Sequence, residues 1–420
     1  MQENNAAAAG DGRAGRLSRW RDDIAARVIE RQLSATTTGR LQLVLPSGRI
    51  AVVGRGGGVE ADLTLKNTAL FWQAVQRGTL GFAECYINGD IESSDIAAVL
   101  RFFVANFAAF EGAGSGWFKA RLPDRVAHRR RTNSRAGSRR NIAAHYDLGN
   151  AFYELWLDPS LTYSSAYFTS KGQSLEAAQA AKMGLVIGAL PPLAGRRVLE
   201  IGCGWGEMAE VMARAGADVT AITVSAEQHA YAEARLANLA LAGRARVAFQ
   251  DYRDVAGAFD HVVSIEMIEA VGEEHWPVYF RTIAERLVPG GSAVVQAITI
   301  REESFEAYRR HPDFIQRYVF PGGMLPTKRI LSEQADGVGL TCETVATFGH
   351  SYAETLRQWR ARFLTAWPRI AALGFDERFR RLWMYYLTYC EVGFDMGIID
   401  VGVYRFAKPG GASSNGGGPA

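Results

Sequence analysis

From about residue 173 to residue 300, short apolar runs alternate with amphipathic stretches. Each run is brief, rich in β-branched and aliphatic residues, and bounded by turn residues, as buried strands are. The predicted strands cover 197–201, 219–224, 247–250, 261–265 and 292–298. The predicted helices cover 173–188, a stretch from about Glu207, 226–241 and 275–287. This alternation predicts a doubly wound α/β sheet, which binds ligands beyond the carboxyl ends of its strands.

The flanking regions follow other patterns. Before residue 111 the predicted strands cover 41–45, 50–53 and 59–65, and the predicted helices cover 20–30, 68–78 and 94–110. After residue 300 the chain is predicted to be mostly helical over 302–340 and 350–395, with a last strand at 399–406. We therefore expect a small α+β domain over 20–110 without a catalytic cluster. Within it, we favour a structural role for Gly81–Asp90 over a functional loop.

Nine basic residues crowd into the stretch 111–140, which begins with a glycine-rich hinge. They are Lys119, Arg121, Arg125, Arg129, Arg130, Arg131, Arg135, Arg139 and Arg140. Two interpretations stay open: a solvated linker, or an arm attracted to an anionic lipid surface, where each basic residue contributes roughly 1 kcal/mol. Aromatic residues are not interleaved with these arginines, which argues against single-stranded nucleic acid as the partner.

Composition excludes several classes of protein. The chain is 48% hydrophobic, as globular proteins are, and no uninterrupted apolar run reaches the ~20 residues that a membrane-spanning helix needs. Residues 1–15 lack the apolar core of a signal peptide. The cysteines are scattered without CxxC spacing, which argues against a zinc site and a disulfide framework. We expect a cytoplasmic protein without a metal, with disordered ends at 1–19 and 409–420.

The strand 197–201 runs into glycines on alternate residues, Gly202, Gly204 and Gly206. Glycine permits a positive φ and lets a ligand approach the backbone without a Cβ in the way. A second strand follows roughly 20 residues later, which is the spacing of a nucleotide-binding βαβ unit. That strand ends in Thr-Val-Ser rather than in the acid that binds the ribose of NAD. The turn therefore predicts a nucleotide-like ligand other than NAD.

Two further stretches carry candidate chemistry. Glu266 and Glu269 follow the fourth strand three residues apart, a spacing that on a helical turn puts both carboxylates on one face. They are either a capping acid and a solvent-facing acid, or a pair for acid–base or cation-stabilising work, which we favour because this strand end borders the glycine turn. Residues 141–168 place Tyr, Asn, Asp and Ser between aromatic residues, which is typical of the lip of a site.

Residues 141–405 resemble the cyclopropane-fatty-acyl-phospholipid synthase family of S-adenosylmethionine-dependent methyltransferases. The matching segments are His145–Asn150 with Thr162–Ser164, the turn 202–206, Thr223–Gln228, Gln250–Asp254, Glu269 with Val271 and Gly272, Phe320–Pro326, Ser351 and Tyr352 ahead of Thr355 and Trp359, and Tyr389–Phe394 before Gly397–Asp400. The resemblance implies a Rossmann-like methyltransferase domain over 141–408 with helical additions for a lipid. Residues 20–110 are more loosely similar to the small lipid-binding-like domain of bacterial members.

The resemblance also implies a cofactor site for S-adenosylmethionine. The implied contacts are Gly202, Gly204 and Gly206 along the cofactor, Thr223, Ser225 and Gln228 around its ribose and amino-acid part, Asp251 and Tyr252 near the adenine, and Tyr163 and Ser164 near the sulfonium.

The implied acceptor is the cis double bond of an acyl chain in a membrane phospholipid. Such a substrate gives the basic stretch 119–140 a rationale, and we expect a protein peripheral to the inner face of the membrane. An alkene is a poor nucleophile, so the methyl group must be held in line and close. Attack leaves a carbocation that aromatic faces and carboxylates can stabilise, and a base must remove a proton while water is kept out. The oligomeric state, including a homodimer, stays open.

In this family the base is thought to be a bound bicarbonate, held by a cysteine-bearing loop, a glutamate, a histidine–isoleucine pair and a tyrosine. The matching positions are Glu269, Ile298 and Tyr352, but Ser165 replaces the cysteine and Gln296 replaces the histidine. Glu266 stands where the family commonly has a small residue, and a carboxylate beside an anion site costs Coulomb energy. Our hypothesis is that Glu266 or Glu269 takes the proton instead of bicarbonate.

Two products stay open. Loss of a proton from the transferred carbon closes a cyclopropane ring, whereas loss of a different proton gives a methyl- or methylene-branched product or a shifted alkene. Three rival classes are weaker. A small-molecule methyltransferase does not need the aromatic crevice, and a non-catalytic lipid-binding protein does not need the cofactor turn. A nucleic-acid methyltransferase is disfavoured, because no NPPY-like tetrad follows the fourth strand.

Overall fold

The computed structural model describes residues 27, 31, 33–70, 73, 77–112, 148–241 and 243–410. Predictions that lie wholly or partly outside these residues concern 1–19, 20–30, 68–78, 111–140, His145–Asp147 and 409–420. The chain divides into two compact units. The first takes the chain up to Arg125 together with His311–Phe314 and Gly374–Val392, and the second takes the rest. The domain bounds drawn from the sequence stay predictions.

A four-stranded sheet in the order β2-β1-β3-β4 belongs to the first unit. Its strands are β1 (Gly39–Val44), β2 (Ile50–Gly56), β3 (Glu60–Leu65) and β4 (Ile91–Glu92). Strand β1 pairs antiparallel with β2 and parallel with β3. Alternate residues of β1, including Leu41 and Leu43, are buried. The apolar side chains of this period-two pattern therefore lie on one face of the sheet, and that face packs against α4.

The helices of the first unit are α3 (Thr79–Asn88), α4 (Ile96–Ala105) and α5 (Phe107–Gly112). Helix α3 takes up most of Gly81–Asp90 and buries Cys85 and Ile87. The single helix predicted at 94–110 is wrong, because Asn106 interrupts it. Its Oδ1 accepts the backbone N–H groups of Thr37 and Thr38 at 2.9 and 3.1 Å. A side chain that binds backbone of a distant segment competes with the continuation of a helix.

Helix α17 (Glu377–Asp395) contributes most of its length to the first unit. Its Arg381 donates a hydrogen bond to the backbone oxygen of Tyr86 in α3. Arg101 of α4 forms an ion pair with Glu391 of α17 at 2.8 Å, and the Glu391 side chain is almost fully buried. A helix far away in the sequence thus completes the core of the small domain, which local patterns cannot reveal.

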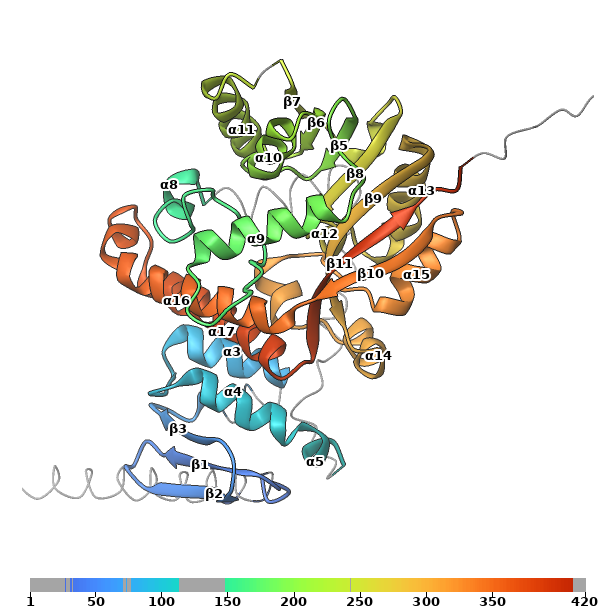
Figure 1. The fold of residues 1–420 in the computed structure, drawn as a ribbon. Helices are drawn as coiled ribbons and strands as arrows, with labels where there is room; N and C mark the ends of the chain where they lie inside the picture. Colours follow the sequence, from blue (N-terminus) through green and yellow to red (C-terminus); the bar gives the residue numbers. More distant parts are fainter. Residues whose placement is uncertain are drawn as a thin grey trace, which may run out of the picture. The chain divides into compact units, whose positions relative to one another are not determined.

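The second unit is built on a seven-stranded sheet in the order β10-β11-β9-β8-β5-β6-β7 (Figure 1). Its strands are β5 (Arg197–Ile201), β6 (Asp218–Thr223), β7 (Ala245–Phe249), β8 (Phe259–Ile265), β9 (Leu287–Ile300), β10 (Thr341–Thr347) and β11 (Ile399–Ala407). Strands β5 to β9 run parallel to one another, and β11 runs antiparallel to β9 and β10. The predicted doubly wound α/β sheet is confirmed.

Strand β10 is absent from the prediction. It is an edge strand in which none of the seven residues is fully buried, so it lacks the apolar alternation that reveals a strand in a sequence. Strand β9 is longer than predicted, because it begins at Leu287 rather than at Ser292. Leu287 pairs with Phe259 of β8, and Gly290 and Gly291 exchange backbone hydrogen bonds with Lys408, which extends the strand ahead of its apolar run.

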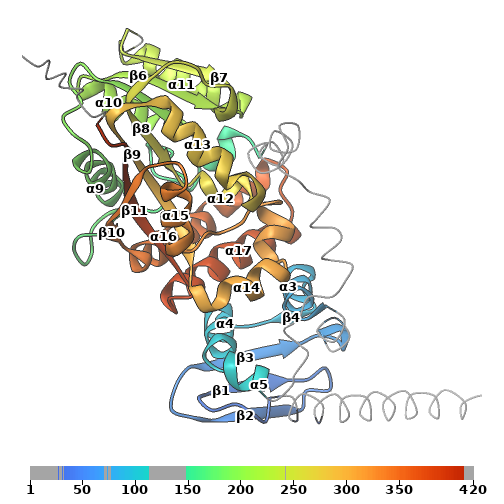
Figure 2. The same cartoon turned by 90° about the vertical axis from the view of Figure 1, so that its right-hand side faces the viewer.

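Helices cover both faces of this sheet, and Figure 2 shows α9 on one side and α12, α13 and α15 on the other. The helices and short turns are α8 (Asn150–Tyr153), α9 (Leu175–Gly188), α10 (Glu207–Arg214), α11 (Ala226–Asn238), η2 (Tyr252–Asp254), α12 (Ile268–Val271), η3 (Glu273–His275), α13 (Trp276–Arg286), α14 (Glu302–Arg310), η4 (Ile315–Val319), α15 (Lys328–Asp336) and α16 (Gly349–Ala372). None of the described helices has the length and apolar character required to cross a bilayer. The covered faces leave the carboxyl edge of the strands for a site.

We expect Arg101→Met to lower the free energy of unfolding of the first unit by about 2–3 kcal/mol, because it removes the Arg101 guanidinium from the buried Glu391 carboxylate. Urea unfolding followed by circular dichroism measures the loss. Arg380→Met removes an exposed pair with Glu377, and its expected cost is below about 1 kcal/mol. Equal losses in the two variants would contradict the importance of the buried pair.

Candidate active site

The turn after β5 has an unusual backbone. Gly202, Gly204 and Gly206 have φ values of 83°, 52° and 89°. A Cβ at Gly202 would lie 3.1 Å from Met267, and one at Gly206 would lie 3.0 Å from Ala232. At Gly204, in contrast, a Cβ would meet no described atom within 4 Å. Two of these glycines therefore allow the chain to pack on itself, and Gly204 leaves open backbone that a ligand can approach.

The polar residues at the end of β6 form one hydrogen-bonded group beside this turn. Thr223 Oγ1 donates to Gln228 Oε1 at 2.9 Å and accepts the N–H of Ser225 at 3.2 Å. Ser225 caps helix α11, because its Oγ accepts the N–H of Gln228 at 3.3 Å. All three side chains are buried. The fold thus brings together the residues that the resemblance places around the ribose and amino-acid part.

Asp251 and Tyr252 lie beyond the carboxyl end of β7, where η2 begins. The Asp251 carboxylate accepts hydrogen bonds from Nε and Nη2 of Arg253 at 2.8 and 2.7 Å. Tyr252 packs edge to face on Tyr279 with ring centroids 5.8 Å apart, and burial raises the pKa of the Tyr252 hydroxyl to about 12. Both residues are held in place, and we did not predict the Asp251–Arg253 pair.

Helix α9 holds the loop that carries two of the predicted contacts, Tyr163 and Ser164. Gln179 Nε2 donates to the backbone oxygens of Thr162 and Ser164 at 3.3 and 3.0 Å. Lys182 Nζ donates to Ser164 Oγ at 2.8 Å. The loop is therefore attached to the helix by a polar side chain on each of two successive turns.

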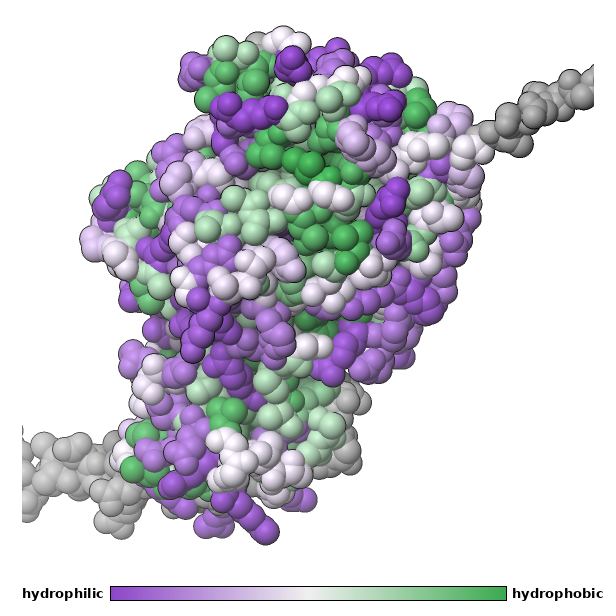
Figure 3. Space-filling view, viewed as in Figure 1, coloured by the Kyte–Doolittle hydropathy of each residue, from purple (hydrophilic) through white to green (hydrophobic). Residues whose placement is uncertain are grey.

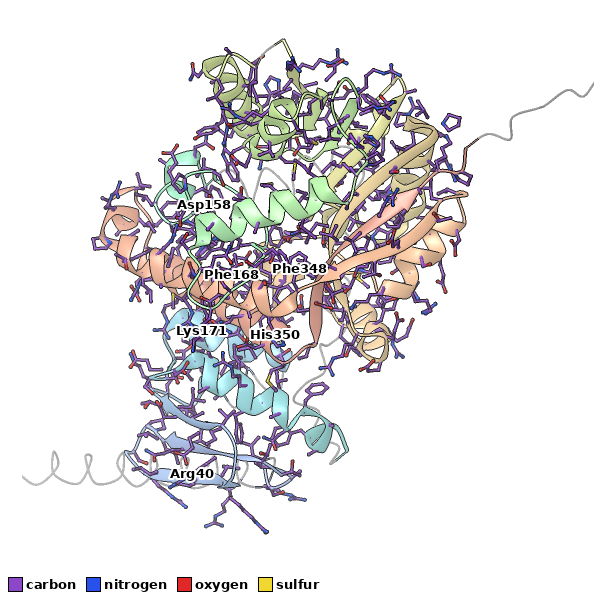
Figure 4. The ribbon with its side chains drawn as sticks, in the orientation of Figure 1. Arg40, Asp158, Phe168, Lys171, Phe348 and His350 are labelled. Atoms are coloured by element: carbon purple, nitrogen blue, oxygen red, sulfur yellow. The ribbon has the colours of Figure 1, made fainter. Side chains whose placement is uncertain are left out.

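Helix α16 holds the next residues of the same loop. Ser351 Oγ accepts the N–H of Phe168, and Thr355 Oγ1 accepts the N–H of Ala166, both at 3.1 Å. Figure 4 shows Phe168 at this end of the loop and Phe348 just ahead of α16. Segments that lie far apart in the sequence thus fix the loop from two sides.

An aromatic cluster lies between the loop and the glycine turn. The ring of Tyr163 is 5.5 Å from that of Tyr153 and 5.3 Å from that of Trp359. Tyr153 in turn lies 5.1 Å from Trp205, which belongs to the glycine turn and donates to Asn150 Oδ1 at 2.8 Å. A cluster of tilted aromatic rings of this kind can stabilise a positive charge and exclude water.

The Glu266 carboxylate lies where β8, β9, α16 and the loop meet. Its Oε1 accepts the Ser165 N–H at 2.9 Å and Gln296 Nε2 at 2.7 Å, and its Oε2 accepts the Tyr352 hydroxyl at 2.6 Å. Burial raises the pKa of Glu266, and these hydrogen bonds act in the opposite direction. Three of the residues that the resemblance assigns to bicarbonate therefore surround a carboxylate of the protein itself.

Glu269 has a poorer set of donors. Its Oε1 accepts the backbone N–H of Ile298 at 2.5 Å, but its buried Oε2 meets no hydrogen-bond donor in the described part of the chain. Burial, and next the charge of Glu266, raise the pKa of Glu269 to about 8. With one donor against three, Glu269 holds a proton at neutral pH, and Glu266 is the better stabilised carboxylate.

Glu266 and Glu269 do not lie together on one helical turn. Glu266 precedes α12 and has a left-handed backbone with φ 48°, a conformation that is uncommon outside glycine. Its N–H donates to the backbone oxygen of Gln296 at 2.8 Å. The hydrogen bonds of backbone and side chain maintain this strained conformation, as is common at functional sites.

We did not predict roles for Gln179 and Lys182. Both are buried, and they lie three residues apart on the apolar face of α9 beside Leu175, Met183 and Val186. A polar pair within the apolar stripe of an amphipathic helix is the signal that could have revealed them.

Comparison with known proteins identifies the family. The model of the family described as mycolic acid cyclopropane synthetase matches residues 133–404. The chain belongs to this family. S-adenosylmethionine is accordingly its cofactor, and the chain is an S-adenosylmethionine-dependent methyltransferase of a family that modifies lipids.

Three relatives are informative. Tuberculostearic acid methyltransferase UfaA1 of Mycobacterium tuberculosis is 38% identical over 350 residues, which are 80% of each chain. Cyclopropane-fatty-acyl-phospholipid synthase of Escherichia coli K12 is 35% identical over 351 residues, 82% of this chain and 87% of the relative. The crystal structure of mycolic acid cyclopropane synthase CmaA1 complexed with SAH and CTAB superposes with a TM-score of 0.60 at 31% identity, over 64% of this chain and 98% of that one.

The described residues fit the cofactor of this family. Gly204 leaves its backbone open, and Thr223, Ser225 and Gln228 supply buried polar groups next to it. We expect Gly204→Val to abolish binding of S-adenosylhomocysteine in titration calorimetry, because the side chain fills this space and strains a positive φ by about 1–3 kcal/mol. Gly257 also has a positive φ, 90°, and an open Cβ position, so Gly257→Val is the control for strain alone. Unchanged binding by the Gly204 variant would contradict this site.

We expect Glu269→Gln to become more stable relative to the natural protein as the pH rises. Because the pKa of Glu269 moves from 4.5 to about 8 on folding, the unfolded state loses its proton first. The natural protein therefore loses stability between these pH values by up to about 1.4 kcal/mol per pH unit, whereas glutamine does not titrate. Urea unfolding at pH 5 and pH 8 measures the difference between the two proteins. A difference that is the same at both pH values would exclude the raised pKa.

Proposed function

We propose that this enzyme transfers the methyl carbon of S-adenosylmethionine to the cis double bond of an unsaturated acyl chain in a membrane phospholipid, and that the product is a cyclopropane fatty acyl group. The observation that carries the proposal is the Glu266 carboxylate held by Ser165, Gln296 and Tyr352. This carboxylate is a base at the carboxyl edge of a methyltransferase sheet, beside aromatic rings and away from bulk water. The E. coli relative named above is a phospholipid enzyme by name.

The chain's own residues have three tasks in this reaction. When bound, S-adenosylmethionine supplies an electrophilic methyl group. The loop 162–168 and the glycine turn hold the reactants in line. The ring of Tyr352, stacked at 4.4 Å on Phe394, and the rings around Tyr163 stabilise the cation that the acyl chain becomes after attack. Glu266 then accepts a proton from the transferred carbon, and the electron pair of that C–H bond closes the ring.

Glu266 also bears on the role of bicarbonate. The donors that would bind this anion are already used by a protein carboxylate, and a second anion beside Glu266 would be repelled. We propose that Glu266 replaces bicarbonate in this chain and that Glu269 stays protonated during the reaction. The proton leaves from Glu266 after the product has departed.

A second product is supported by a specific observation. The proposed base, Glu266, is fixed by three hydrogen bonds. It therefore removes the proton that lies nearest to its fixed carboxylate, which need not be the proton that a mobile bicarbonate would remove. If that proton lies on the acyl chain instead of on the transferred carbon, the product is a methyl-branched chain with a retained or shifted double bond. A methylene branch forms instead when a hydride first shifts to the cationic carbon and the transferred carbon then loses the proton. The relative from M. tuberculosis is named for tuberculostearic acid, which makes this the second candidate.

A membrane substrate is consistent with the surface of the second unit. The face in Figure 3 shows apolar surface beside α9 with polar residues around it. We propose that the enzyme acts at an anionic membrane surface and that residues 119–140 contribute basic attraction to it.

Turnover on vesicles of unsaturated phospholipid with labelled methyl donor tests this function. We expect label in the acyl chains, and mass spectrometry with NMR distinguishes ring from branch. Glu266→Gln should lower kcat at least ~100-fold, because it removes the general base. Added bicarbonate should not change the turnover of the natural enzyme.

Glu273→Gln is the control, because Glu273 pairs with Arg309 at the surface instead of facing the donors, and it should keep normal turnover. Absence of label from acyl chains would refute the proposed reaction. A Glu266→Gln enzyme with the natural rate would refute the assigned base but not the reaction. Branched product alone would select the second candidate.

A further inference from the structure

Lys182 is a charged side chain in the interior of the second unit. It is fully buried on α9, and its Nζ donates to Ser164 Oγ at 2.8 Å. Lysine is almost never fully buried unless another group compensates its charge, because removing an ammonium from water is costly. The proposed reaction gives Lys182 no role, so the presence of a buried lysine on α9 requires an explanation.

Four carboxylates face Lys182 from different elements: Glu266 after β8, Asp158 after α8, Glu207 of α10 and Glu200 of β5. Glu266 interacts with it most strongly of the four. Glu207 forms an ion pair with Arg235, Asp158 is bound by Ser160, and burial raises the pKa of Glu200 to about 8. The charge of Lys182 is therefore directed mainly at Glu266.

Lys182 also reaches Glu266 through the backbone. It holds the side chain of Ser164, and the N–H of the next residue, Ser165, donates to Glu266 Oε1 at 2.9 Å. Gln179 holds the backbone oxygen of Ser164 at 3.0 Å. The two side chains of α9 thus determine where the Ser165 N–H points.

We propose that Lys182 is a positioning residue for Glu266: its ammonium group orients the Ser164–Ser165 turn and keeps the Glu266 carboxylate ionised, so that it can accept the proton. This inference rests on the proposed function. It adds a residue that touches neither the acyl chain nor Glu266 directly and acts through charge and through the loop.

The sign of the effect follows from the charges around Glu266. A cation nearby favours the carboxylate and lowers its pKa, whereas burial disfavours the charge and raises the pKa. Ser165, Gln296 and Tyr352 donate to it but carry no charge at neutral pH. Removal of Lys182 therefore raises the pKa of Glu266, and the acidic limb of the pH–rate profile moves to higher pH.

The pH dependence of kcat/KM on phospholipid vesicles provides the test. In Lys182→Met we expect the acidic limb to move to higher pH by about one unit. At pH values on this limb, kcat/KM of the variant should then be about tenfold lower than that of the natural enzyme. Lys182→Arg keeps the charge and should keep the limb near its natural position. Gln179→Leu weakens the same loop without removing a charge, so it should lower kcat and move the limb by clearly less than Lys182→Met does.

A second readout does not depend on turnover. Urea unfolding between pH 5 and pH 8 gives the difference in stability between each protein and its Glu266→Gln form. That difference should grow more steeply with pH in the Lys182→Met background than in the natural background, because Glu266 titrates at higher pH without the cation. This measurement applies even if Lys182→Met is inactive.

The outcomes separate the two proposals. A natural acidic limb in Lys182→Met, or equal pH dependence of stability in the two backgrounds, would overturn the role of Lys182 while methyl transfer stands. The same shift in Gln179→Leu as in Lys182→Met would assign the effect to loop position alone and would also overturn it. Failure of the natural enzyme to label acyl chains would refute the proposed function instead.

Discussion

A carboxylate that is taken out of water must be surrounded by hydrogen-bond donors or give up its charge. Two glutamates at the carboxyl edge of the sheet meet this constraint in different ways. Glu266 has three donors and a lysine beyond them, and Glu269 has one donor and an oxygen without one among the described residues. The same residue type, three positions apart, thus lies in two different environments, one rich and one poor in donors.

This arrangement requires most of the second unit. The donors to Glu266 come from a loop, from β9 and from α16, and the loop is held in turn by α9. No single element contains the site, because each supplies one side chain or one N–H group. The mixed edge of the sheet matters as well, since β11 pairs with β9 and completes the wall on which Gln296 and Ile298 lie.

The cofactor half and the acyl half of the site differ in how far they follow the family pattern. The glycine turn and the Thr223 group match it residue by residue. The acyl half departs at Ser165, Gln296 and Glu266, and these departures are coupled: all three residues share one set of hydrogen bonds. Our proposal that Glu266 replaces the bound anion accounts for the differences at all three positions together.

The sequence by itself determined the sheet, the glycine turn and the candidate acids, because apolar periodicity and glycine spacing are local properties. It did not reveal the edge strand β10, the break at Asn106 or the left-handed backbone of Glu266. Only the tertiary structure decided which glutamate has three hydrogen-bond donors and which polar side chains of α9 hold the loop beside it. The donors to Glu266 come from segments far away in the sequence: Tyr352 is 86 residues from it and Ser165 is 101 residues from it. A local sequence pattern cannot show that such distant residues lie side by side.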